Sequence, residues 1–340
     1  MMPARAFIVG CSGLALTADE RAFLRDAEPW GLILFGRNVG DAEQIRALVA
    51  EFRDAVGRAD APVLIDQEGG RVQRIRPPLA LSHPPGARYG ELYARDPEAG
   101  VRAARIGAEL MAGELVSLGI TVDCLPVLDL PVDGMTQAIG DRAYADAPEA
   151  VAALGQAVVE GMLAAGVLPV IKHMPGHGRA TVDSHYHLPR VAADRATLEA
   201  SDFAPFRALN RAPVGMTGHL VFEAIDPGRP ATLSPIVLSE IVRGYIGFDG
   251  LLMSDDLSMK ALFGPVGESA AGALAAGCDL ALHCNGDMGE MREVAAAAPR
   301  LEGRSAERAA AALALIATPA GADLVALADR RDRLLKRATA

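Results

Sequence analysis

The sequence predicts a single (β/α)8 barrel, an α/β fold of the TIM type. Short runs rich in Val, Ile and Leu recur along the 340 residues, and polar residues or Gly and then a segment with helical periodicity follow each run. The runs are apolar along most of their length and do not alternate with polar residues, which is typical of parallel strands that helices cover from outside. The alternative is an open doubly wound sheet, but the glycine fingerprint of Rossmann-type nucleotide sites is missing.

Eight apolar runs fit the strands of such a barrel: 6–11, 31–35, 62–66, 120–128, 167–172, 213–218, 249–254 and 278–283. The amphipathic stretches between them predict helices near 41–57, 100–118, 146–164, 194–210, 235–245 and 265–276. Two Ala-rich segments, 303–317 and 321–337, are expected to pack as terminal helices on the barrel wall. Their solvated basic face is expected to consist of Arg330, Arg331, Arg333 and Lys336. Because no linker or repeat divides the chain, residues 1–340 are expected to form one domain.

Composition narrows the choice of partners and compartment. A net charge of −10 argues against nucleic acid, because proteins that bind phosphate backbones usually carry a basic face. The four cysteines form no C-x-x-C pair and lie in or beside apolar runs, which favours reduced, buried thiols. No stretch resembles a secretion signal or a membrane span. We therefore expect a cytoplasmic monomer with no membrane partner.

The seventh predicted strand ends in two carboxylates. An apolar run at 250–253 leads directly into Asp255 and Asp256. Since barrel active sites lie at the carboxyl ends of the strands, a carboxylate fixed there could attack the anomeric carbon of a sugar. Either aspartate could instead cap the helix that follows, because Asp is a favoured N-cap residue.

The fifth predicted strand leads into a loop rich in histidine. Residues 173–187 hold four of the seven histidines, and Asp183 stands two residues before His185. A neighbouring carboxylate stabilises imidazolium, which makes such a histidine a proton donor near neutral pH. A solvated loop histidine is the alternative interpretation. Lys172, one of three lysines in the chain, lies at the strand end and could donate to sugar hydroxyls or balance a carboxylate.

These segments resemble the motifs of family 3 glycoside hydrolases. Residues 172–178 read KHMPGHG and residues 183–185 read DSH, which is similar to the K-H-F-P-G-H-G…D-S-H signature of the family. Residues 254–259, SDDLSM, resemble its nucleophile motif, and residues 65–74, IDQEGGRVQR, resemble its substrate-binding loop. Nearly the whole chain is covered, and the bacterial single-domain β-N-acetylglucosaminidases are the most similar members. Met174 in place of Phe, and Arg179-Ala180 in place of an acidic-polar pair, depart from the pattern.

The resemblance implies a retaining β-N-acetylhexosaminidase that needs no cofactor and no metal. It implies that Asp255 is the nucleophile, His185 the acid/base and Asp183 the partner of His185. It further implies that the residues holding the terminal N-acetylglucosamine are Asp66, Arg74, Arg142, Lys172 and His173. The implied substrate is a small muropeptide or amino-sugar, N-acetylglucosamine linked to 1,6-anhydro-N-acetylmuramic acid with or without peptide, in cell-wall recycling.

Three other functions compete with this prediction. A barrel hydrolase could bind Zn²⁺ through Asp255 and the loop histidines, which are His173, His177, His185 and His187. The barrel could also bind sugar without catalysis. In a third alternative, phosphate in place of water accepts the glycosyl group, because a neutral histidine repels an anion less than a carboxylate does.

Overall fold

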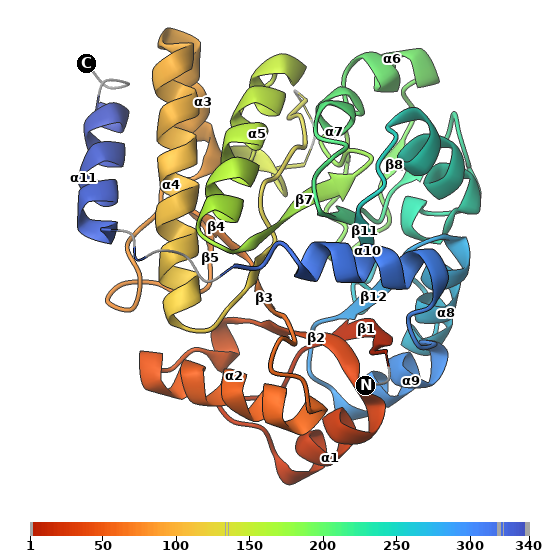
Figure 1. Cartoon of the computed structure of the whole chain (residues 1–340). Coiled ribbons are helices and arrows are strands. Elements are labelled where there is room, and N and C mark those ends of the chain that lie inside the picture. The colour runs from red at the N-terminus through yellow and green to blue at the C-terminus, as the bar shows by residue number, and fades with distance from the viewer. Residues whose placement is uncertain (1–2, 133, 135, 318–320, 322, 337–340) are drawn as a thin grey trace.

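The computed structural model describes residues 3–132, 134, 136–317, 321 and 323–336, and its centre is a closed barrel of parallel strands (Figure 1). The barrel strands, in chain order, are β1 (Arg5–Val9), β2 (Pro29–Leu34), β3 (Val63–Ile65), β6 (Val122–Asp123), β7 (Leu168–Met174), β9 (Val214–Thr217), β11 (Leu251–Asp256) and β12 (Leu280–His283). Each pairs with the next, and β12 returns to β1, where Phe7 lies opposite Ala281. The predicted fold class is confirmed.

Burial explains why these apolar runs become strands. Every residue of β2, β3, β7 and β12 is buried, because the inside of the barrel is filled with side chains and helices cover its outside. The predicted strand 120–128 was too long, since only Val122–Asp123 is strand and an isolated bridge joins Val127 to Lys172. Pro126, inside that run, has no N–H to donate to a neighbouring strand.

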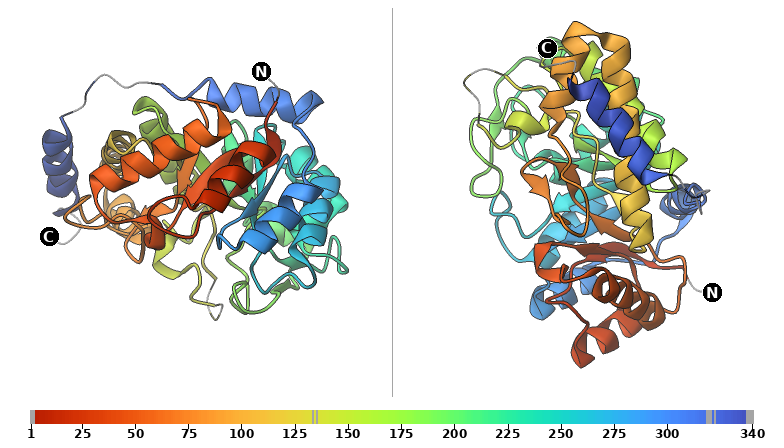
Figure 2. Two further views of the ribbon diagram at one scale, coloured as in Figure 1. Left: turned by 90° about the horizontal axis from the view of Figure 1, so that it is seen from below. Right: turned by 90° about the vertical axis from the view of Figure 1, so that its left-hand side faces the viewer.

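Helices surround the barrel in alternation with the strands (Figures 1 and 2). They are α1 (Ala18–Ala27), α2 (Ala42–Val56), α3 (Gly86–Arg95), α4 (Pro97–Ser117), α5 (Pro148–Ala164), α6 (Arg195–Ala200), α7 (Ala204–Ala208), a π-helix (Val237–Tyr245), α8 (Val266–Ala276), α9 (Met288–Ala297), α10 (Gly303–Leu313) and α11 (Leu324–Leu335). The sequence prediction missed α1, α3 and α9. It also joined α6 and α7 into one helix over 194–210, although Pro205 has no N–H for a continuous helix and instead lies in the first turn of α7.

Two pairs of short strands lie outside the barrel. The antiparallel strands β4 (Gln67–Gly69) and β5 (Val72–Gln73) follow β3 at once, and we call this unit the β4–β5 hairpin. The strands β8 (Arg190–Val191) and β10 (Val221–Phe222) pair in parallel and join the loops after β7 and β9. Both pairs are formed by loops at the carboxyl ends of barrel strands, so they help to shape that end of the barrel.

The C-terminal helices pack on the outside of the barrel, with α11 beside α4 and α3 (Figures 1 and 2). One prediction about them was wrong: Arg331 is buried, with 4% of its surface exposed, whereas Arg330, Arg333 and Lys336 are exposed. Arg331 follows Leu327 and precedes Leu334 on the buried face of α11, and its guanidinium reaches a buried histidine. Residues 322 and 337 of the predicted helix 321–337 lie outside the described residues.

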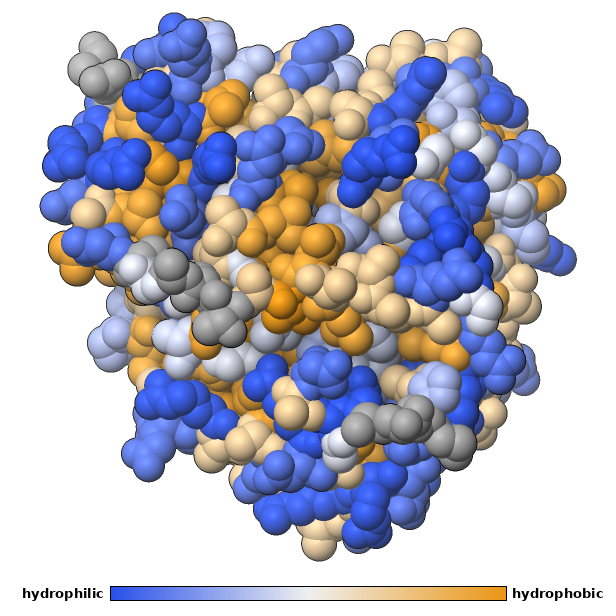
Figure 3. Space-filling model, viewed as in Figure 1, coloured by the Kyte–Doolittle hydropathy of each residue, from blue (hydrophilic) through white to orange (hydrophobic). Residues whose placement is uncertain are grey.

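The molecular surface mixes both kinds of side chain. On the face shown in Figure 3, hydrophobic residues gather toward the middle and the upper left, and hydrophilic residues dominate the lower part. Among the described residues, no helix combines the length and the apolar character that a membrane crossing requires.

Candidate active site

A cavity of about 270 Å³ opens at the carboxyl end of the barrel. Apolar side chains such as Ile33, Phe35 and Met216 form part of its wall. The wall also includes all eight residues predicted to act on substrate: Asp66, Arg74, Arg142, Lys172, His173, Asp183, His185 and Asp255. Strands β3, β6, β7 and β11 and their following loops bring these residues together from distant parts of the sequence.

Asp255 lies near the end of β11 and faces the cavity. Its Oδ1 atom accepts a hydrogen bond of 2.8 Å from the N–H of Asp256. Burial alone would raise the pKa of Asp255, but the charges of His173 and His219, this N–H and Lys172 outweigh it, so the pKa lies below its ordinary value. The carboxylate is therefore ionised at neutral pH, the state that a nucleophile requires.

Asp256 has a different task from its neighbour. Its Oδ1 atom accepts from the N–H groups of Ser258 (3.0 Å) and Cys284 (3.1 Å), and its Oδ2 atom accepts from the Ser258 hydroxyl (2.7 Å). These bonds fasten the turn after β11 to the end of β12. Neither aspartate caps α8, whose N-cap is Pro265. The carboxylate of Asp256 therefore stabilises the backbone, whereas the carboxylate of Asp255 is available to a substrate in the cavity.

Asp183 and His185 form a pair on the rim of the cavity. Asp183 Oδ1 accepts from the backbone N–H of His185 (2.9 Å) and contacts its Nδ1 atom (2.8 Å). Burial tends to raise the pKa of Asp183, but its hydrogen bonds with His185 lower it overall, so it presents a carboxylate to the ring. Since Asp183 holds Nδ1, the opposite nitrogen, Nε2, is the one that can exchange a proton with a substrate. The His185 side chain is 64% exposed, as a group that meets a leaving sugar must be.

Ser184 anchors the loop between these two residues. It is buried, and its hydroxyl lies 3.0 Å from Nε2 of His177. Burial lowers the pKa of His177 to about 4, with a further contribution from His173, so this ring is neutral. His177 thus supports the loop without charge.

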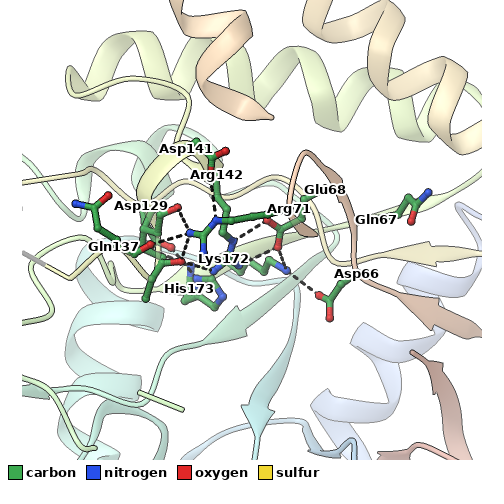
Figure 4. Close-up of polar contacts among 12 residues, drawn as sticks. Asp66, Gln67, Glu68, Arg71, Asp129, Gln137, Asp141, Arg142, Lys172 and His173 are labelled. Atoms are coloured by element: carbon green, nitrogen blue, oxygen red, sulfur yellow. Dashed lines mark hydrogen bonds and ion pairs between the residues drawn. The ribbon is translucent and has the colours of Figure 1, made fainter. Parts of the chain in front are cut away.

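Side chains of opposite charge alternate in a largely buried cluster that lines the cavity (Figure 4). Lys172 Nζ lies 2.9 Å from Asp66 and 2.7 Å from Glu68. Arg142 contacts both oxygens of Glu68 at 2.8 Å, and Arg74 lies 3.2 Å from Asp66. Figure 4 shows Glu68 directed toward Lys172 and Arg142, whereas Gln67 points away. The sequence interpretation missed Glu68, although it follows Asp66 in the same predicted loop.

The cluster holds all its members in their charged forms. Burial raises the pKa of Glu68, but Arg142 and Lys172 outweigh it and lower the value to about 2. Lys172 and Arg74 likewise hold the pKa of Asp66 far below its ordinary value in spite of burial. In return, the two carboxylates raise the pKa of Lys172 against its own burial. The result is a rigid set of donors and acceptors, suited to the fixed hydroxyl pattern of a sugar.

Asp129 is a second functional residue that the sequence prediction missed. Its Oδ2 atom lies 2.6 Å from Nδ1 of His173, and its Oδ1 atom accepts from the backbone N–H of both His173 (3.2 Å) and His177 (2.7 Å). Asp129 therefore fixes the ring of His173 and leaves its Nε2 atom for the cavity. Its position directly after the predicted fourth strand, 120–128, was the signal that could have identified it.

The residues proposed for a zinc site do not converge. His187 is exposed and is not among the residues that line the cavity. Within the described part of the chain, no group of three or more His, Cys, Asp or Glu side chains could hold a metal ion.

Replacing Lys172 by Met is expected to destabilise the fold in a pH-dependent way. Removing one partner of a buried ion pair costs about 3–5 kcal/mol, because an uncompensated charge stays behind. The lowered pKa values of Asp66 and Glu68 contribute stability that is present above their unfolded pKa values and lost as pH falls through the folded ones. The stability difference between wild type and Lys172→Met should therefore be largest at pH 7 and shrink as the pH falls below about 4. Urea unfolding at several pH values measures it, and a pH-independent difference would contradict this account.

Comparison with known proteins gives one consistent family. Residues 8–316 match the model of the glycosyl hydrolase family 3 N terminal domain. The chain is 42% identical over 282 residues to a beta-hexosaminidase of Alkalilimnicola ehrlichii, covering 82% of this chain and 80% of that one. A beta-hexosaminidase of Methylococcus capsulatus is 43% identical over 277 residues, or 80% of each chain. The crystal structure of NagZ from Neisseria gonorrhoeae in complex with N-trifluoroacetyl-D-glucosamine superposes with a TM-score of 0.88 at 31% identity, covering 100% of this chain and 99% of that one.

Proposed function

Because this chain belongs to glycosyl hydrolase family 3, we propose that it is a β-hexosaminidase that releases terminal β-linked N-acetylglucosamine with retention of configuration. One observation carries the proposal: the half-buried, ionised Asp255 and the Asp183–His185 pair line the same cavity as the charged cluster. A carboxylate nucleophile, a proton donor and a sugar-binding wall are what a retaining glycosidase needs.

In the first step, Asp255 attacks the anomeric carbon of the sugar. Protonated His185 donates its Nε2 proton to the glycosidic oxygen, the bond to that oxygen breaks, and the leaving group departs as an alcohol. The sugar is now an ester of Asp255, and His185 is neutral. Asp183 favours the imidazolium form before the step and keeps the ring oriented during it.

In the second step, water replaces the departed group. Neutral His185 accepts a proton from the water as its oxygen attacks the anomeric carbon, and Asp255 leaves as a carboxylate. Two inversions at one carbon give net retention. Both catalytic groups then return to their starting protonation states.

The remaining predicted residues are proposed to hold the sugar ring. Asp66 accepts hydrogen bonds from hydroxyls, while Arg74, Lys172 and His173 donate to them. Arg142 lies on the same wall, with its guanidinium fixed by Glu68. Because the ion pairs of the cluster already fix these groups, sugar binding costs little side-chain entropy.

We further propose that the natural substrate is a muropeptide fragment, N-acetylglucosamine β-1,4-linked to 1,6-anhydro-N-acetylmuramic acid with or without peptide, cleaved in the cytoplasm during cell-wall recycling. The resemblance of residues 65–74 and 172–185 to bacterial β-N-acetylglucosaminidases supports this choice. Four buried, unpaired cysteines are consistent with a reducing compartment. We also propose that the enzyme works as a monomer, because all eight residues predicted to act on substrate line a cavity within one chain.

Comparing two chromogenic substrates tests the activity. We expect release of 4-nitrophenol from the N-acetyl-β-glucosaminide, with kcat/KM on the order of 100-fold or more above that for the β-glucoside, because a site that binds the acetamido group discriminates against its absence. Equal rates would contradict the assignment to N-acetylglucosamine. No release from either would favour a non-catalytic sugar-binding protein. Formation of sugar 1-phosphate when phosphate is added would assign phosphate as the acceptor in place of water.

A further inference from the structure

Helix α11 carries a buried arginine that the reaction does not use. Arg331 and His83 are 4% and 2% exposed, and Arg331 Nη1 lies 3.1 Å from His83 Nδ1. On the other side of the ring, His83 Nε2 lies 2.7 Å from Glu114 Oε2 in α4. We propose that Arg331, acting through His83, is a positioning residue for the sugar-binding wall of the active site, an inference that rests on the proposed function.

Donor chemistry fixes the state of the linking histidine. A guanidinium can only donate hydrogen bonds, so the Nδ1 atom of His83 must accept. The ring proton is then on Nε2 and is donated to Glu114. Arg331 therefore holds His83 as one neutral tautomer in one orientation. Without Arg331, this acceptor would stay buried without a partner, which is costly, and the ring would lose its constraint.

The backbone of His83 supports the β4–β5 hairpin directly. Its carbonyl accepts from the N–H of Gly70 (2.8 Å), and its N–H donates to Oε1 of Gln73 (3.1 Å). The turn of the hairpin also packs closely on the segment after His83: a Cβ atom on Gly69 would lie 2.4 Å from the Pro84 carbonyl oxygen. A displacement of His83 must therefore move the hairpin.

The hairpin in turn positions the charged cluster. Glu68 lies within β4 and binds Lys172 and Arg142. The Gln67 side chain accepts from the backbone N–H of Arg74 (2.9 Å) and of Ile75 (3.0 Å), which fixes the strand end that carries Arg74. Buried contacts thus run without a break from α11 through His83 to the residues that are proposed to hold the sugar. α11 lies beyond residue 316, where the family match ends, and on the side of the barrel where β4 and β5 lie (Figures 1 and 2).

The catalytic groups do not depend on this link. Asp255 is held by β11, and the Asp183–His185 loop is anchored through Ser184 to His177 after β7. Weakening the link should therefore impair binding of the sugar more than the chemical steps. This split between KM and kcat separates positioning from a purely structural role.

Kinetics of Arg331→Met with 4-nitrophenyl N-acetyl-β-glucosaminide test the proposal, with N-acetylglucosamine as a competitive inhibitor. We expect KM and the inhibition constant Ki to rise together by roughly 3- to 10-fold, a size typical of coupling through packed networks, while kcat changes less than about twofold. Arg331→Lys keeps a donor and should recover most of the loss. Arg330→Met, the same change at the exposed neighbouring position, is the matched control and should leave KM, Ki and kcat as in wild type.

The outcomes distinguish this inference from the proposed function. Unchanged KM and Ki, even with a lowered Tm, would overturn it, as would an equal effect of Arg330→Met or a loss confined to kcat. If Arg331→Met does not fold, Arg331→Lys and Arg331→Gln make the same comparison, because each keeps a shorter donor and should raise KM and Ki in a graded way. If wild type releases no nitrophenol, the proposed function fails, and calorimetric binding of N-acetylglucosamine to the same variants then decides the inference.

Discussion

Asp255→Ala is expected to lower kcat by roughly 10⁴-fold or more while the fold stays intact, because loss of a nucleophile removes the covalent route altogether. Among the described residues, the side chain forms a hydrogen bond only with the N–H of the next residue, so its removal leaves the end of β11 in place. Steady-state hydrolysis of the nitrophenyl N-acetyl-β-glucosaminide measures the loss, and circular dichroism checks the fold. Near-normal activity would refute Asp255 as the nucleophile.

The stereochemistry of a rescued reaction makes this test sharper. Truncation to Ala leaves space on the face of the sugar that Asp255 would attack. A small anion such as azide could enter that space and displace an activated leaving group in one inversion, which gives the α-linked sugar azide. Wild-type enzyme, with two inversions, should give only β products. Rescue with a β-linked product would contradict an attack from the side of Asp255.

His185→Ala is expected to lower kcat/KM, and the loss should be larger for substrates whose leaving group requires protonation. General acid catalysis contributes on the order of 10²- to 10⁴-fold, so loss of that size is expected for a disaccharide, whose leaving alcohol is a poor one. Dinitrophenolate departs without protonation, so kcat/KM for a dinitrophenyl glycoside should fall only a little. The comparison uses kcat/KM because this quantity reports the first step, whereas kcat also contains the second step, which needs His185 as a base.

The same loop supplies the matched control. His187 is exposed two residues further on and is not part of the cavity wall, so His187→Ala should leave both substrates unaffected. Asp183→Asn should fall between wild type and His185→Ala, because the ring then keeps a hydrogen-bond partner but loses the charge that favours imidazolium. An equal loss of kcat/KM on good and poor leaving groups would count against His185 as the acid.

The eight barrel strands could be located in the sequence because a fully buried strand appears as a short, nearly continuous apolar run. Runs such as 6–11 and 31–35 are apolar from end to end, and each overlaps a barrel strand. Helices with a wide apolar face were also predicted, among them α2 and α5. Shorter helices were missed, because the ten residues of α1 make fewer than three turns, which is too short a stretch to establish a helical period in the sequence. The strand predicted over 120–128 was too long, because the hydrophobicity of the run does not show that strand pairing is interrupted near Pro126.

The order of residues along the chain is enough to identify the side chains at the carboxyl ends of the strands, and therefore Asp66, Lys172, His173 and Asp255 as candidates for the site. The contacts of the site residues are known only from the folded barrel: Glu68 binds Arg142 and Lys172, Asp129 supports His173, and Arg331 is a buried partner of His83. Each strand is an apolar run of a few consecutive residues, so its end can be recognised from neighbouring residues in the sequence. The contacts join residues 74, 44 and 248 positions apart, and such pairs are fixed by how the barrel closes and its helices pack, which no local pattern records.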